Sequence, residues 1–136
     1  MFTLGRDREI ENAIKHVGSK EKAALLITLV DDLHNYLEGT ENRIEESIKL
    51  AFADGCTGVW ESAGTWLRKL CNENESFLEV WGQLAESKKA NTRFRVACFL
   101  EDIPEEIQKE IGEKLRHDTS RKVKEMSEAR IEEMKL

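Results

Sequence analysis

The sequence has too few turn-forming residues for a β-sandwich or a β-barrel, since its 136 residues include one proline and eight glycines. Those folds need many tight turns, and their strands show apolar residues at every second position, a pattern that is missing here. A disordered chain is disfavoured as well, because such chains are poor in apolar residues, whereas 40% of these residues are apolar. The common residues are Ala, Leu, Glu and Lys, which favour helices.

Long apolar segments are also missing. The longest run, Ala23 to Val30, is far shorter than the roughly 20 residues of a membrane span, and the N-terminal MFTLGRDRE lacks the apolar core of a signal peptide. Cys56, Cys71 and Cys98 are an odd number without C-x-x-C spacing, and each lies beside apolar residues. This pattern predicts reduced, mostly buried thiols. We therefore expect a cytoplasmic protein that does not enter a membrane.

Positive charge is in deficit, with 21 Lys and Arg against 27 Asp and Glu, for a net charge of −6. An acidic chain repels phosphate backbones and anionic lipid surfaces. Nucleic acids are therefore not expected as partners, and a basic protein is.

Apolar residues recur at helical spacing along nearly the whole chain, which predicts an all-α fold of about eight short helices. Cap residues mark their ends. The expected helices are Arg6 to Val17, ended by Gly18; Lys20 to Glu38, capped by Ser19 and ended by Gly39; and six more that begin at Thr40, Thr57, Asn74, Asn91, Pro104 and Ser120. Short loops make consecutive helices antiparallel neighbours, so residues 1–136 are expected to form a single domain.

The C-terminal third repeats a short pattern. Asn91, Thr92, Arg95 and Val96 return as Asp118, Thr119, Lys122 and Val123. With Arg93 to Leu100, Ile103-Pro104 and His117 to Val123, the segment 91–129 resembles a HEAT repeat. The resemblance implies stacked helical hairpins and an ion pair from Arg93 or Arg95 to an acid of the adjacent hairpin. HEAT-like proteins are mostly binding scaffolds, some act on nucleic acids or chromophores, and small bacterial ones neutralise toxins.

Motifs for catalysis or cofactor binding are missing. There is no G-x-S-x-G, no glycine-rich phosphate loop and no H-E-x-x-H, so neither a catalytic residue nor a cofactor or metal is expected. The best enzymatic candidate is the pair Asp31 and His34, three residues apart on one helix face. The alternative functions are therefore a small enzyme that uses this pair or a cysteine, and an adaptor subunit of a larger complex.

Three tryptophans lie at helical spacing, which usually indicates core packing. Trp60 and Trp81 fit the apolar stripes of their helices. Trp66 has a second interpretation as a partly exposed interface anchor, because tryptophan is enriched at binding hot spots.

The helices that begin at Thr40, Asn74 and Pro104 have acidic outer faces. The resemblance to HEAT repeats implies that such helices line one concave surface. Its expected residues are Glu41, Glu45, Glu46, Glu75, Glu79, Glu86, Glu105, Glu106, Glu110 and Glu113. An ordinary solvated face would mix both charges, whereas no Lys or Arg lies between Asn72 and Ser87. The sequence thus predicts a non-enzymatic module that binds a basic protein, most concretely an immunity-type inhibitor of a basic, nuclease-like toxin.

Overall fold

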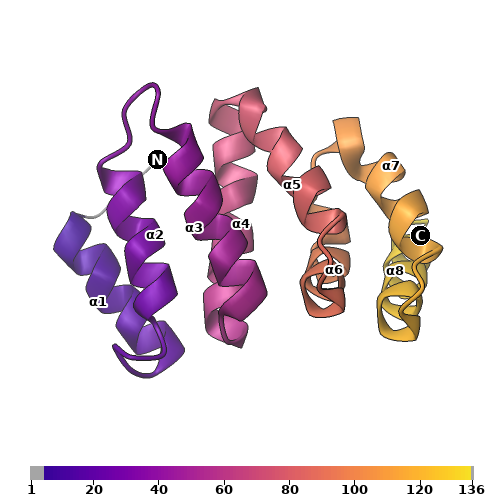
Figure 1. Ribbon diagram of the computed structural model, residues 1–136, viewed down its shortest axis with the longest axis horizontal. Helices are drawn as coiled ribbons and strands as arrows, with labels where there is room; N and C mark the ends of the chain where they lie inside the picture. Colours follow the sequence, from indigo (N-terminus) through magenta and orange to yellow (C-terminus); the bar gives the residue numbers. More distant parts are fainter. Residues whose placement is uncertain (1–4, 136) are drawn as a thin grey trace. The chain divides into compact units, whose positions relative to one another are not determined.

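The computed structural model describes residues 5–135, which form eight α-helices and two short 3-10 helices and contain no β-strand (Figure 1). The all-α fold is therefore as predicted. The helices are α1 (Arg6–Val17), α2 (Ala24–His34), α3 (Glu41–Asp54), α4 (Thr57–Glu73), η1 (Glu75–Phe77), α5 (Leu78–Ala85), α6 (Ala90–Cys98), η2 (Leu100–Asp102), α7 (Glu105–Arg116) and α8 (Arg121–Met134). None of these helices combines the length and the apolar character that a membrane crossing requires.

The chain divides into two units of similar size, and the division falls within α4, between Lys69 and Leu70. In the first unit, α2 packs against both α1 and α3. Its core comprises Leu26, Leu29, Val30, Leu33, Ile44, Ile48, Phe52 and Val59. Trp60 is half-buried, and its ring lies 6.4 Å from that of Phe52.

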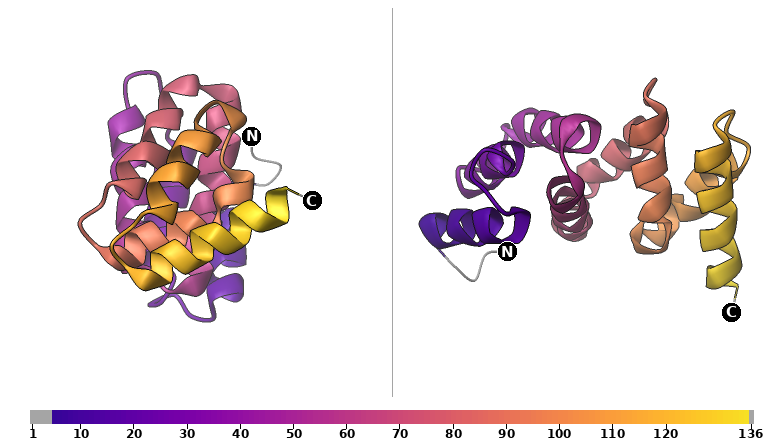
Figure 2. Two further views of the ribbon diagram at one scale, coloured as in Figure 1. Left: turned by 90° about the vertical axis from the view of Figure 1, so that its right-hand side faces the viewer. Right: turned by 90° about the horizontal axis from the view of Figure 1, so that it is seen from below.

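In the second unit, helices that are two apart in the chain pack together. α5 contacts α7 and α6 contacts α8, and Figure 2 shows α6 and α8 side by side. The core is formed by Phe77, Val80, Trp81, Leu84, Val96, Leu100, Leu115 and Val123. Trp81 is fully buried, and its ring lies 5.7 Å from that of Phe99. The prediction that these hairpins are HEAT repeats, and that the whole chain forms a single domain, stays a prediction.

Several predicted caps occur where the sequence places them. Gly18 ends α1 with φ +114°, a conformation that side chains disfavour, and its N–H donates to the carbonyl of Ile14 at 2.8 Å. The side chain of Asn74 accepts the N–H of Ser76 at 3.0 Å at the start of η1. Ser120 is the N-cap residue of α8, as expected.

The second predicted helix, Lys20 to Glu38, is shorter in the structure, where α2 covers only Ala24–His34. At its end, the hydroxyl of Thr40 accepts the N–H of Leu37 at 3.0 Å and donates to the carbonyl of the same residue at 2.7 Å. These bonds favour a loop over continued helix, because they satisfy the backbone locally. Leu37, which the predicted helix would have placed on its apolar stripe, is consequently 70% exposed.

Two further helix starts differ from the prediction by one or two residues. α6 begins at Ala90 rather than after Asn91, whose side chain accepts a hydrogen bond from Lys122 Nζ at 3.2 Å instead of capping. Pro104 precedes α7 as its N-cap residue and is not its first helical residue. A proline there still suits the helix start, because its missing N–H would have no helical partner.

Candidate functional site

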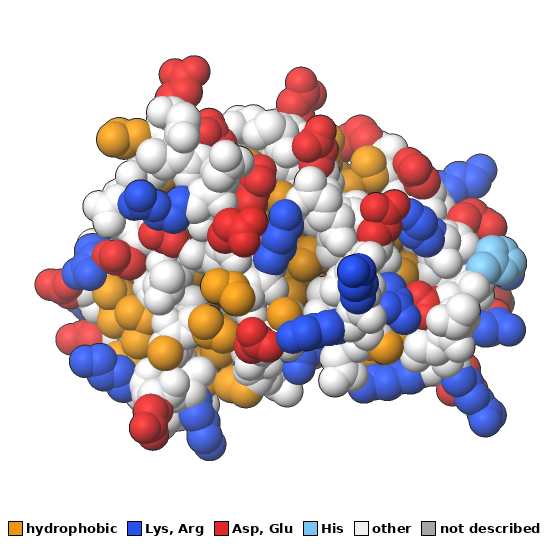
Figure 3. Space-filling model, in the orientation of Figure 1, with side chains coloured by type: hydrophobic (Ala, Val, Ile, Leu, Met, Phe, Trp, Pro, Cys, Tyr) orange, Lys and Arg blue, Asp and Glu red, His pale blue; other side chains and the backbone are white. Residues whose placement is uncertain are grey.

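A groove lies between α5 and α7, which pack side by side in the second unit. It has a volume of about 180 Å³. Its lining combines the apolar or small residues Leu78, Gly82, Ala85, Ile107 and Ile111 with the charged residues Glu79, Glu86, Glu110 and Lys114. In the space-filling view, acidic side chains flank apolar atoms over α7 (Figure 3).

Helical periodicity explains why these side chains line one groove. Glu79 and Gly82 on α5 and Glu86, the C-cap residue of this helix, are separated by three and four residues, so they lie on one side of it. The opposite face of α5 carries Val80 and Trp81, which are fully buried in the core. The core residues therefore fix the rotation of α5, and that rotation directs its acidic face towards α7.

The charges of the groove are unevenly compensated. Lys114 forms an ion pair with Glu86, and the hydrogen bond from its ammonium group, together with its positive charge, lowers the pKa of the Glu86 carboxyl. Glu79 and Glu110 are exposed and have no ion-pair partner among residues 5–135. Three carboxylates against one ammonium group leave the groove net negative.

The remaining predicted acids of this unit lie outside the groove. Glu75, Glu105 and Glu106 are exposed at the starts of η1 and α7. Glu113 has two nearby basic side chains in its own turn of the chain, with Arg116 Nη1 at 3.2 Å and His117 Nε2 at 3.7 Å. The structure thus brings together three of the predicted residues, Glu79, Glu86 and Glu110.

The acids of α3 belong to the first unit, and one of them has a structural role. Glu41 is half-buried and accepts the N–H of Gly39 at 2.9 Å and the hydroxyl of Tyr36 at 3.5 Å. It therefore stabilises the loop before α3. Glu45 is half-buried and Glu46 is exposed. That these residues share one concave surface with those of α5 and α7 stays a prediction.

Trp66 lies at the surface of the first unit. Its side chain is half-buried, and the ammonium group of Lys69 lies 4.7 Å from its ring centre, within the range of a cation–π contact. It lines a second groove together with His16 and Ser62. Trp66 is thus accessible to a partner, while Trp81 is a core residue as its spacing predicts.

Of the enzymatic candidates Asp31 and His34, Asp31 takes part in the packing of helices. Asp31 accepts a hydrogen bond from the guanidinium of Arg6, which ties α1 to α2. Asp32 accepts the hydroxyl of Ser47 from α3 at 2.5 Å, and His34 is half-buried. Within residues 5–135, no three His, Cys, Asp or Glu side chains form a cluster of the kind that holds a metal ion.

The three thiols differ in environment, and the expectation that they are mostly buried is wrong for Cys56, which is exposed at the start of α4. Cys98 is half-buried and Cys71 is buried. Burial raises the pKa of the Cys71 thiol to about 11, against a smaller opposing effect of a hydrogen bond with Trp81. Because the thiolate is the reactive form, Cys71 is inert at neutral pH.

We expect Cys56 to react with a maleimide in the folded protein at neutral pH and Cys71 to react only after unfolding, as measured by mass spectrometry of the labelled peptides. Rapid labelling of Cys71 in the folded state would contradict this assignment.

A thiol whose pKa is raised on folding stabilises the fold below its ordinary pKa, and this contribution is lost as the pH rises. The free energy of unfolding should therefore fall between pH 9.0 and about 11. In Cys71→Ala the fall should be smaller, when the free energy of unfolding of each protein is compared with its value at pH 7.

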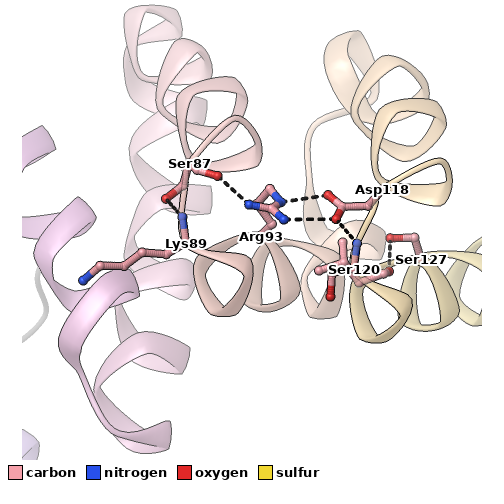
Figure 4. Close-up of polar contacts among 7 residues, drawn as sticks. Ser87, Lys89, Arg93, Asp118, Ser120 and Ser127 are labelled. Carbon is pink, nitrogen blue, oxygen red and sulfur yellow. Dashed lines mark hydrogen bonds and ion pairs between the residues drawn. The ribbon is translucent and has the colours of Figure 1, made fainter.

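The predicted ion pair of the C-terminal segment is made by Arg93, on α6. Its Nε lies 2.8 Å from Asp118 Oδ2, and its Nη2 donates to Oδ1 at 3.1 Å (Figure 4). Nη1 donates to the carbonyl of Ser87 at 2.8 Å, and Asp118 also accepts the N–H of Ser120. This network joins the loop before α6 to the loop before α8. Helix α7, which lines the groove, lies between those two loops in the chain.

Sequence reasoning identified the acids of the groove and missed its apolar part. Ile107 and Ile111 fit the apolar stripe that helical spacing predicts for packing, so the spacing does not distinguish them from core residues. Gly82 lies inside α5. A glycine inside an eight-residue helix was the available signal, since glycine is unfavourable there.

Comparisons of the chain with models of known protein families, with curated proteins and with solved structures found no match.

Proposed function

We propose that this protein binds a basic protein through the groove between α5 and α7. The observation that carries the proposal is an apolar lining, formed in part by Leu78 and Ile107, beside the carboxylates of Glu79 and Glu110. These two carboxylates form no ion pair with any of the described residues. Apolar surface supplies affinity, and complementary charge speeds association and excludes acidic partners.

The most specific role that we propose is inhibition of a basic toxin, in the manner of an immunity protein. A nuclease presents a positive surface to its nucleic-acid substrate, and an acidic protein that covers this surface blocks the substrate. The net charge of −6 and the uncompensated acids of the groove support this role. The proposed HEAT-like stacking of α5 to α8 would present the groove as part of a binding scaffold.

The proposal is tested by capture from the cells that produce the protein. Tagged wild-type protein should retain a protein of high isoelectric point at about 50 mM salt and release it at about 500 mM, where charges are screened beyond about 4 Å. The captured protein, once identified, is expressed alone and together with this chain. Growth arrest that co-expression relieves supports the inhibitor role. Capture of only acidic or neutral proteins, unaffected by salt, contradicts the proposal.

A further inference from the structure

Gly82 occupies a position in α5 where the fold does not require glycine. It lies inside the helix, where glycine is less favourable than alanine. Its φ is not positive, and a Cβ added to it would meet no atom within 4 Å apart from its chain neighbours and the backbone of its own helix. Gly55 shows the contrast, because a Cβ there would lie 2.5 Å from the carbonyl oxygen of Ala51. Close packing therefore explains why a glycine is needed at Gly55, but it does not explain the glycine at Gly82.

The open space above Gly82 belongs to the groove, which this residue lines together with Glu79 and Ile107. Without a side chain at Gly82, the backbone of α5 is accessible between the carboxylates of Glu79 and Glu86. The groove volume of about 180 Å³ is below the roughly 300–1,000 Å³ of typical small-molecule sites. It suits a single anchoring side chain of a protein partner better than a metabolite.

We propose that Gly82 determines specificity by receiving one apolar side chain from a helical segment of the partner. This inference rests on the proposed function and specifies the chemistry of the bound segment. A third helix laid along α5 and α7 would present an apolar anchor over Gly82. Lysine or arginine one helical turn before and after the anchor would then reach Glu79 and Glu110. The motif is thus a basic helix with a leucine-sized residue between two cations.

The probe is a fluorescein-labelled, alanine-based helical peptide that carries one leucine with lysines four residues before and after it. One control peptide replaces the leucine by glutamine, and another replaces the lysines by glutamates. Binding is measured by fluorescence anisotropy, and the bound surface is mapped by amide chemical shifts of the protein. We expect the lysine–leucine peptide to bind best and to shift amides of α5 and α7, because both the anchor and the cations contribute.

The protein variants are Gly82→Leu, which fills the groove, and Gly82→Ala, which adds one methyl group. We expect Gly82→Leu to weaken binding of the lysine–leucine peptide by about tenfold or more. Gly82→Ala should weaken it less while raising the melting temperature by roughly 2–5 °C. Gly112→Ala is the matched control, since Gly112 lies inside α7, does not line this groove and has space for a methyl group 3.6 Å from Leu100. It should leave binding unchanged.

The outcomes separate this inference from the proposed function. If wild type does not prefer the leucine peptide to the glutamine peptide, or if Gly82→Leu and Gly82→Ala bind it as wild type does, the inference is wrong. If the inference about Gly82 is wrong but Glu79→Lys/Glu110→Lys still abolishes binding, the proposed function stands without that inference. Peptide binding and basic-protein capture that are both insensitive to this charge reversal would overturn the proposed function itself.

Discussion

Replacement of both Glu79 and Glu110 by lysine is expected to lower the affinity for the captured basic protein by about a hundredfold or more. The two carboxylates line the same groove and lack cationic partners among the described residues, so the reversal exchanges two attractions for two repulsions. Most of the loss should be in the association rate, because exposed charges steer the encounter. Surface plasmon resonance at two salt concentrations measures both rates.

The fold should tolerate this change, because exposed charges contribute little to stability. We expect an unchanged far-UV circular dichroism spectrum and nearly the same melting temperature. The matched control is Glu128→Lys/Glu132→Lys, which makes the same change of net charge at two exposed positions on α8. If the control weakens binding as much as the groove variant does, net charge rather than the groove determines recognition, and the assignment of the site fails.

A large loss of stability is expected when the ion pair between Arg93 and Asp118 is broken. Their side chains are only 16% and 9% exposed, so removal of one partner leaves a largely buried charge without its counter-ion. Asp118→Ala should therefore lower the free energy of unfolding by about 3 kcal/mol. The exposed pair of Arg121 and Glu125 has a similar separation of 2.7 Å, and Glu125→Ala should leave the free energy of unfolding nearly unchanged, because water screens an exposed pair. Urea denaturation measures both values.

The same pair predicts a response to acid. Burial alone would raise the pKa of Asp118, but the hydrogen bonds from Arg93 and from the N–H of Ser120, with the positive charge of Arg93, outweigh burial and lower it. A carboxyl group whose pKa falls on folding stabilises the fold above its ordinary pKa, and this contribution disappears as the pH falls through the lowered value. Asp118→Asn should therefore lose less stability on acidification than wild type, by denaturation at several pH values. Equal acid sensitivity of the two proteins would show that Asp118 does not contribute.

The local features of the fold were predictable, because they depend on residues that are close in sequence. The spacing of Ile44, Ile48 and Phe52 predicts the buried face of α3, and Gly18 and Ser120 mark helix ends in the structure. One error occurs where a side chain bonds to a residue far away in the chain. Asn91 accepts a hydrogen bond from Lys122, 31 residues away, and no rule based on helix caps anticipates such a partner.

The sequence by itself determined the helical class, the approximate helix bounds and the acidic faces, since these follow from backbone propensity and periodicity. Only the tertiary structure decided which acids belong to a site. Glu41 stabilises a loop, Glu86 pairs with Lys114 from a different helix, and Glu79 and Glu110 line one groove. The physical reason is that a carboxylate's role depends on the cations and apolar groups that surround it in space. Those neighbours are set by the packing of α5 against α7, which residues far apart in the chain determine together.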